Sequence, residues 1–204
     1  MPAEFRPAEF RIVRLQIQTG PMKVGRAPLR QYRTDGLQQV ERLLIDDRGS
    51  HGVWTADDGH EQRAIDVHHR DHPQSRNRKG GAGLSVFGTG DYDALRERYG
   101  PHLVDGAVGE SVLVDAPAGL ADLDFPTTFA IRGAAGMIAF VQARVADPCV
   151  EFSRFCLGEQ PSPQVSDAVR QALIDLDDGH RGYRAAAAAA GTITVGDRLV
   201  LGPS

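Results

Sequence analysis

The chain carries, from Met137 to Leu157, the sequence MIAFVQARVADPCVEFSRFCL. Residues 137–145 alternate between two faces with a period of two, which predicts a β-strand. The strand is followed by Asp147, a preferred N-cap, and by Pro148, which suits the first position of a helix. The stretch therefore predicts a strand that delivers Cys149 to the first turn of a helix.

The two cysteines of the chain have different expected roles. The unpaired N–H groups and the dipole of a helix N-terminus favour a Cys149 thiolate, although the Asp147 carboxylate would compete for those N–H groups. The alternative is that Cys149 simply packs, since free cysteines are among the most buried residues. Cys156 lies seven residues on, about 10 Å along one helix, which is too far for a disulfide. Its neighbours Phe155 and Leu157 predict a structural role.

The composition is that of an ordinary soluble protein. The chain has 204 residues, of which 41% are hydrophobic and 25% charged, and this suits one domain with a real core. Its net charge of −4 gives no overall attraction to nucleic acid or to anionic membranes, so neither is expected as a partner. The chain has only two cysteines, which suits a reducing compartment. It has no apolar run long enough to cross a membrane and no signal-peptide pattern, so we expect a cytoplasmic protein.

Short alternating segments elsewhere predict a mainly β fold. The repeated Pro-Ala-Glu-Phe at 2–5 and 7–10 is too short for a repeat architecture. We interpret residues 1–9 as a flexible lead-in and 10–204 as a single domain. Strands are expected at 10–18, 40–45, 53–54, 64–67, 112–114, 127–131 and 185–190, with a hairpin at 192–201 around Gly196-Asp197. The alanine-rich segment 185–190 is assigned to a strand because its neighbours belong to a sheet, although alanine favours helix.

Two further segments have helical patterns. Asp91 can cap a short helix that Gly100-Pro101 ends. The segment Pro163–Asp178 has the spacing of an amphipathic helix, and Gly179 follows it. Eight or nine short strands with two or three helices predict a closed β-barrel decorated by helices.

The loop after residue 67 is the most basic part of the chain. It contains His68, His69 and His72, and then Arg70, Arg76, Arg78, Lys79 and the glycine-rich 80–83. Adjacent histidines on a strand point to opposite faces, and zinc needs three or four converging ligands, so the pattern does not favour a metal site. Arginines with a glycine-rich backbone suit a phosphate, and an ordinary solvated loop is the alternative. The chain has no P-loop, dinucleotide fingerprint or nucleophile elbow.

Four segments taken in order resemble the MOSC domain, named for the C-terminal domain of molybdenum cofactor sulfurases. They are Arg-Ala-Ile-Asp-Val at 63–67, Gly-Ala-Val-Gly-Glu-Ser-Val at 106–112 with Gly-Leu at 119–120, Pro148-Cys149, and Arg-Gly-Tyr at 181–183 leading to 195–199. The resemblance covers about residues 10 to 202 and implies a β-barrel of the MOSC type. Ser111 departs from the asparagine that the family usually has after Gly-Glu.

The resemblance also implies a site. It makes Cys149 a sulfur carrier or a molybdenum ligand, and it places Arg181 near this cysteine. Basic residues would hold the phosphate of the molybdenum cofactor (molybdopterin), and Arg70, Arg76, Arg78 and Lys79 are the candidates, although no family motif matches them individually.

We therefore expect a stand-alone MOSC protein that acts in sulfur transfer or in molybdenum-dependent reduction of N-hydroxylated compounds. A non-catalytic sulfur or cofactor carrier that docks on a partner enzyme is the alternative. The chain has no room for the pyridoxal-phosphate desulfurase domain of fused sulfurases. A separate cysteine desulfurase or an electron-transfer protein is thus the expected partner.

Overall fold

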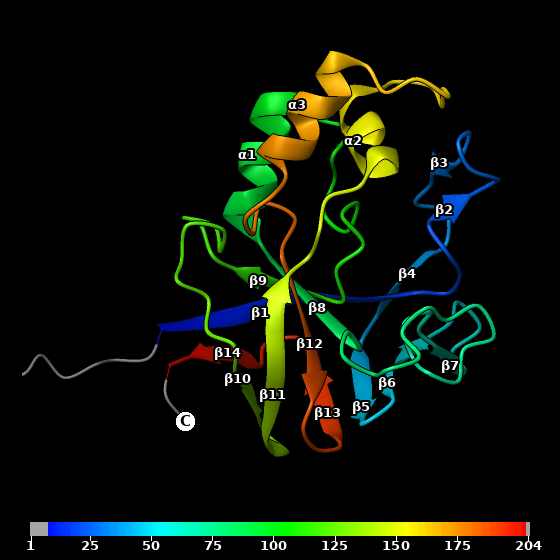
Figure 1. The fold of residues 1–204 in the computed structure, drawn as a ribbon. Helices are drawn as coiled ribbons and strands as arrows, with labels where there is room; N and C mark the ends of the chain where they lie inside the picture. Colours follow the sequence, from blue (N-terminus) through cyan, green and yellow to red (C-terminus); the bar gives the residue numbers. More distant parts are fainter. Residues whose placement is uncertain (1–7, 203–204) are drawn as a thin grey trace, which may run out of the picture.

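The computed structural model describes residues 8–202, with 14 strands and three helices (Figure 1). The strands are β1 (Ala8–Gln18), β2 (Lys23–Val24), β3 (Gln31–Tyr32), β4 (Leu37–Val40), β5 (Arg42–Asp46), β6 (Gly49–Thr55), β7 (Glu61–Ile65), β8 (Leu84–Gly88), β9 (Val112–Asp115), β10 (Phe129–Gly133), β11 (Gly136–Val145), β12 (Tyr183–Ala187), β13 (Gly191–Thr194) and β14 (Arg198–Leu201). The helices are α1 (Thr89–Tyr99), α2 (Val150–Leu157) and α3 (Asp167–Asp175).

Seven strands close into a barrel in the order β14, β10, β11, β12, β8, β9, β1, and β1 pairs back to β14. β1 can close the ring because it is long: its first residues pair with β14, and its later ones pair with β9 and with β4 outside the ring. Only β8 and β9 run parallel within this barrel, and α1 with the loop after it makes the crossover that parallel strands require. The predicted closed β-barrel with a few helices is confirmed.

Two apolar clusters hold these parts together. The barrel interior is filled by side chains with no exposed surface, among them Ile12, Leu15, Val112, Phe140 and Leu199. A second cluster joins the helices to one end of the barrel and includes Phe87, Tyr92, Leu103, Phe152 and Leu176. Figure 1 shows the three helices together at that end. Because Phe152 belongs to α2, the second cluster fixes the start of that helix and with it Cys149.

A smaller antiparallel sheet lies beside the barrel, in the order β13, β5, β6, β7. It packs closely on the barrel at Gly52 of β6, where an added Cβ would lie 2.7 Å from Val40 and 2.9 Å from Ile17. The basic loop then leads from β7 back to β8 of the barrel, and β2 and β3 form a separate two-stranded ribbon. No helix in the described part of the chain is long and apolar enough to span a bilayer.

The helix starts differ from those predicted. The helix expected at Pro163–Asp178 is α3, which begins at Asp167 because Ser166 is its N-cap and accepts a hydrogen bond from the Val169 N–H at 3.2 Å. Asp91 is the third residue of α1 and not its cap; its carboxylate accepts from the Gly88 N–H at 3.1 Å. Asp147 is not an N-cap either, since α2 begins at Val150.

The predicted hairpin at 192–201 is wrong. Its first strand, β13, pairs with β5, whereas its second, β14, pairs with β1 and β10 of the barrel. The turn itself forms at Gly196 (φ +98°), where the Asp197 carboxylate accepts from the Thr194 N–H at 2.8 Å. Barrel closure thus separates two strands that look locally like a hairpin.

Several other predicted boundaries change. The strand expected at 40–45 divides at Glu41 into β4 and β5, which belong to different sheets. The strand expected at 185–190 is confirmed in its first part, as β12. Residues 8–9 of the predicted lead-in belong to β1, and residues 1–7 lie outside the described range.

Candidate functional site

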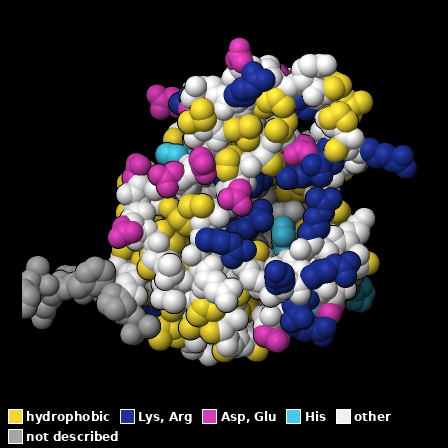
Figure 2. Space-filling model, in the orientation of Figure 1, with side chains coloured by type: hydrophobic (Ala, Val, Ile, Leu, Met, Phe, Trp, Pro, Cys, Tyr) yellow, Lys and Arg dark blue, Asp and Glu magenta, His cyan; other side chains and the backbone are white. Residues whose placement is uncertain are grey.

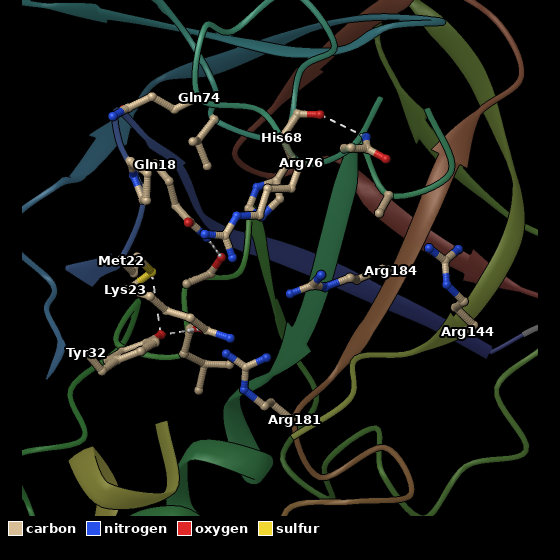
Figure 3. A pocket seen from close by; sticks show the side chains of 16 residues that line it. Gln18, Met22, Lys23, Tyr32, His68, Gln74, Arg76, Arg144, Arg181 and Arg184 are labelled. Carbon is tan, nitrogen blue, oxygen red and sulfur yellow. Dashed lines mark hydrogen bonds between the residues drawn. The ribbon is translucent and has the colours of Figure 1, made fainter. Parts of the chain in front are cut away.

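A pocket of about 330 Å³ lies between the barrel, the β2–β3 ribbon and the basic loop, and four arginines line it: Arg76, Arg144, Arg181 and Arg184. Figure 2 shows Lys and Arg side chains gathered around a hollow on the right of that face. Figure 3 shows Arg181 and Arg184 pointing into the middle of the pocket, with Arg144 at its far side. The strong concentration of positive charge is suited to an anion.

Two of these arginines stand directly opposite each other on neighbouring strands. Arg144 of β11 and Arg184 of β12 are register partners, and like charges in that position are destabilising. Burial, with the nearby Arg181 and Arg144 cations, lowers the pKa of Arg184 from its ordinary value. Fixed cations that repel one another at a pocket wall are the arrangement that a bound anion would stabilise.

Arg181 lies two residues before β12, against the segment that follows β11. It is 8% exposed, its guanidinium lies 4.7 Å from the centre of the Phe152 ring, and its Nη1 donates to the Asp147 carbonyl at 3.3 Å. Its buried Nε has no hydrogen-bond partner in the structure. A buried donor without a partner costs free energy, so a ligand that accepts from this group would be stabilised.

Cys149 is the N-cap of α2, with extended backbone (φ −144°, ψ 150°), and its side chain makes no capping hydrogen bond. The thiol is half-buried and packs against the second apolar cluster. Cys149 is not among the residues that line the pocket. It is nevertheless close enough for a thiolate charge to act on two that are, since it favours the charged form of Arg184 and raises the pKa of Tyr32.

Cys156 has the structural environment predicted for it. It has no exposed surface, and burial raises the pKa of its thiol to about 12. A thiol with so small a thiolate fraction at neutral pH is a poor nucleophile. Both cysteines are free, as their spacing predicted.

The segment at 106–112 forms the wall opposite the arginines. Tyr32 O–H lies 2.9 Å from the carbonyls of both Ala107 and Val108, and burial raises the pKa of Tyr32 well above its ordinary value, so it stays a neutral donor. Gln18 Nε2 donates to the Gly109 carbonyl at 2.6 Å. This segment is thus fixed by side chains from β1 and β3.

Glu110 is buried behind that wall. Its Oε2 accepts from Tyr92 O–H at 2.8 Å, and the same tyrosine oxygen accepts from the Val108 N–H at 3.0 Å. Its Oε1 has no partner. Burial raises the pKa of the Glu110 carboxyl to about 7, against the opposing effect of the Tyr92 hydrogen bond.

The basic loop contributes less to the pocket than its composition suggests. Arg76 lines the pocket, whereas the exposed side chains of Arg70, Arg78 and Lys79 do not. Its glycines serve close packing: an added Cβ on Gly83 would lie 2.9 Å from the Cα of Gly49, at the start of β6.

The histidines of this loop lie in turns and not on a strand, and His68 and His69 have different surroundings. His68 lines the pocket, where its Nδ1 is 2.9 Å from Asp66 Oδ1. His69 is buried against Asp46.

Sequence reasoning missed Arg144, Arg184 and Tyr32 as site residues. Arg184 follows directly after the Arg-Gly-Tyr segment quoted for the family resemblance, so its nearness to Arg181 was visible in the sequence. Arg144 gave no such signal, because its neighbour on β12 depends on the register between two strands far apart in the chain.

No family model and no curated protein sequence matches the chain. Among solved structures, the YuaD protein from Bacillus subtilis matches with a TM-score of 0.56 at 14% identity, over 96% of each chain. YiiM from Escherichia coli matches with a TM-score of 0.51 at 14% identity, over 97% of this chain and 71% of that one. A hypothetical protein of solved structure matches with a TM-score of 0.55 at 15% identity, over 97% of this chain and 70% of its own. Likeness at this identity shows only that the chain shares the fold of these structures.

Proposed function

We propose that the chain is a stand-alone MOSC-like protein that binds molybdenum cofactor in the arginine pocket and uses Cys149 as a sulfur carrier or molybdenum ligand. The observation that carries the proposal is the cross-strand pair of Arg144 and Arg184, joined by Arg181 at the same pocket. Three cations that line one pocket favour an anionic ligand, and the cofactor carries a phosphate.

The residues present fit the anionic end of that group. Arg181 offers a buried Nε that has no partner, and Arg184 points into the pocket beside it (Figure 3). The volume of about 330 Å³ falls at the lower end of small-molecule sites, which span roughly 300–1,000 Å³. Arg76 would add a fourth contact from the loop. Arg70, Arg78 and Lys79, which do not line the pocket, would attract an anionic ligand from a distance.

Cys149 supplies the sulfur chemistry in this proposal. It is the N-cap residue of α2, its side chain makes no capping hydrogen bond, and its thiolate form is the nucleophile. Such a thiolate can attack the outer sulfur of a donor persulfide: a Cys149 persulfide forms, and the donor leaves as its own thiolate. A thiolate is also a soft metal ligand. When bound, the cofactor would supply molybdenum redox chemistry, such as reduction of N-hydroxylated compounds with electrons from a flavin or iron–sulfur partner.

A non-catalytic sulfur carrier is the second candidate. The observation in its favour is that Cys149 does not line the pocket, so persulfide loading by a partner cysteine desulfurase would need no cofactor there. In that case the chain would dock on the enzyme that receives the sulfur.

Elemental analysis of the untagged, full-length chain separates the two candidates. About one molybdenum per chain, lost in Cys149→Ser and in Arg184→Gln but kept in the exposed control Arg170→Gln, supports cofactor binding. Persulfide on Cys149 without molybdenum supports the carrier. If neither is found after exposure to cofactor and to a cysteine desulfurase, both proposals are wrong.

A further inference from the structure

Away from the arginine pocket, Asp46, His51 and His69 meet at the β5–β6 turn. His69 Nε2 lies 3.4 Å from Asp46 Oδ2, and His51 Nε2 lies 3.8 Å from the same oxygen. One ligand atom from each residue lies within 4.8 Å of the other two. None of the three lines the arginine pocket, and the mechanism proposed above uses none of them.

The cluster is built by backbone that holds it in place. Asp46 Oδ1 accepts from the N–H groups of Arg48 at 2.8 Å and Gly49 at 3.0 Å, which fixes the carboxylate. His69 Nε2 lies against both carboxylate oxygens, 3.2 Å from Oδ1 and 3.4 Å from Oδ2. Gly49 lets the loop approach, because an added Cβ there would lie 2.7 Å from the His69 Cα. The His69 side chain is 2% exposed, so its place is fixed by packing.

The spacing matches a small divalent cation. Ligand atoms about 2.0–2.2 Å from zinc in a tetrahedral site lie about 3.4 Å from one another. The contacts of Asp46 Oδ2 with the two histidines, at 3.4 and 3.8 Å, are close to this value. Two imidazoles with one carboxylate suit zinc and its first-row neighbours and do not suit magnesium or calcium, which prefer oxygen.

A second carboxylate stands behind His69. Asp71 Oδ2 is 4.0 Å from His69 Nδ1, and Asp71 forms an ion pair with Arg48. His69 Nδ1 accepts from the Asp71 N–H at 3.2 Å, so the ring proton is on Nε2 and faces Asp46. A metal ion at Nε2 would move the ring proton to Nδ1, which breaks the hydrogen bond from the Asp71 N–H; the Asp71 carboxylate, 4.0 Å from Nδ1, would have to turn to accept that proton. A carboxylate behind a metal-bound histidine is the usual arrangement in zinc sites.

We propose that Asp46, His51 and His69 bind one divalent transition-metal ion, with zinc the best fit. The Asp46 side chain is 37% exposed, so a fourth position faces solvent. Binding would tie the basic loop, through His69, to β5 and β6. Since the same loop brings His68 and Arg76 to the arginine pocket, the ion would stiffen one wall of that pocket.

Cobalt titration of the untagged, full-length chain, stripped by chelator and dialysed, tests the proposal. We expect saturation at one Co²⁺ per chain, with visible absorption of a tetrahedral or five-coordinate ion that Zn²⁺ abolishes. We expect a Kd for zinc on the order of 1 µM or below. Asp46→Asn and His51→Gln keep side-chain size and should weaken binding by at least about 100-fold, and Asp71→Asn by about 10- to 100-fold.

The matched control is His60→Gln, because His60 is an exposed histidine at the other end of the β6–β7 hairpin. It should bind as the parent chain does. Circular dichroism on each variant confirms that the barrel is folded. The proposal is overturned if binding does not saturate at one ion, if folded His51→Gln binds as tightly as the parent chain, or if His60→Gln loses binding equally.

Discussion

Replacement of Arg184 by Gln should make the protein more stable in the absence of an anion and less able to respond to one. Arg184 faces Arg144 across the β11–β12 ladder, with Arg181 nearby. Like charges directly opposite in a sheet cost roughly 0.2–1 kcal/mol, and glutamine removes the charge while keeping most of the side chain. We therefore expect the free energy of unfolding to rise by roughly 0.2–1 kcal/mol in a buffer without phosphate.

Phosphate should make the parent chain more stable than Arg184→Gln. A ligand at a hundred times its Kd adds about 2.7 kcal/mol to the stability of the protein that binds it. For a chain of 204 residues, each kcal/mol corresponds to roughly 2–4 °C in Tm. The parent chain should thus melt up to a few degrees below Arg184→Gln without phosphate and several degrees above it with saturating phosphate.

Thermal melts over a phosphate series, at constant ionic strength, give the measurement. Arg170→Gln is the control, because Arg170 is exposed on α3 and forms an ion pair with Asp167, away from the pocket; it should follow the parent chain. In phosphate-free buffer, added chloride should reduce the Tm difference between the parent chain and Arg184→Gln, since it screens the repulsion between Arg144 and Arg184. The reasoning fails if Arg184→Gln is the less stable protein in phosphate-free buffer and phosphate stabilises both proteins equally.

Three other predictions follow from single environments. Burial raises the Cys156 pKa to about 12 from 9.0, so its thiolate fraction falls about 1,000-fold and iodoacetamide should label Cys149 first. Faster labelling of Cys156 would contradict this order of reactivity. In chemical denaturation, Cys149→Ser should keep the stability of the parent chain, since serine is a good N-cap, whereas Cys156→Ser should lose about 1–3 kcal/mol. Burial raises the Glu110 pKa from 4.5 to about 7, so the folded state holds a proton that the unfolded state releases. The contribution of neutral Glu110 to the free energy of unfolding should therefore be fully present below pH 4.5 and be lost as the pH rises toward 7. The parent chain should lose on the order of 3 kcal/mol over this range relative to Glu110→Gln, and parallel stability–pH curves for the two proteins would refute this. Gly182→Ala should lose at least roughly 1–3 kcal/mol, because Gly182 has φ +79° and a Cβ there would lie 2.5 Å from the Val86 carbonyl; urea denaturation that shows an unchanged stability would refute it.

The period-two pattern was sufficient for the barrel but not for its connections. The strands at 112–114 and 127–131 could be predicted because short apolar runs bounded by turn residues are typical of strands buried on both faces, and the first three residues of β9 and of β10 are all buried. The hairpin at 192–201 could not, because its turn is real while the partners of β13 and β14 are chosen by the closure of the barrel. A local pattern holds no information on which distant strand will compete for a backbone edge.

The start of α2 shows the same limit over a shorter distance. The dipeptide at 147–148 has the composition of a helix start, yet Ala146 still donates its N–H to the Gly182 carbonyl at 2.8 Å, as part of the sheet. The chain therefore remains extended through Cys149 (φ −144°) before it turns into the helix. Sequence reasoning found the strand, the helix and the cysteine between them, but tertiary hydrogen bonding moved the helix start beyond Asp147.

The arginine pocket itself depends on a β-bulge that no periodicity reveals. Val141 faces Ala186, so a regular antiparallel ladder would place Ala143 opposite Arg184; instead the register shifts, and Arg144 takes that place. The extra residue is absorbed near Gln142, whose φ of +56° is costly for a residue with a side chain. The strained backbone at Gln142 and the repulsive pair of Arg144 and Arg184 thus arise from the same bulge. The strained backbone and the repulsive pair lie at one wall of one pocket, which agrees with the proposal that an anion binds there.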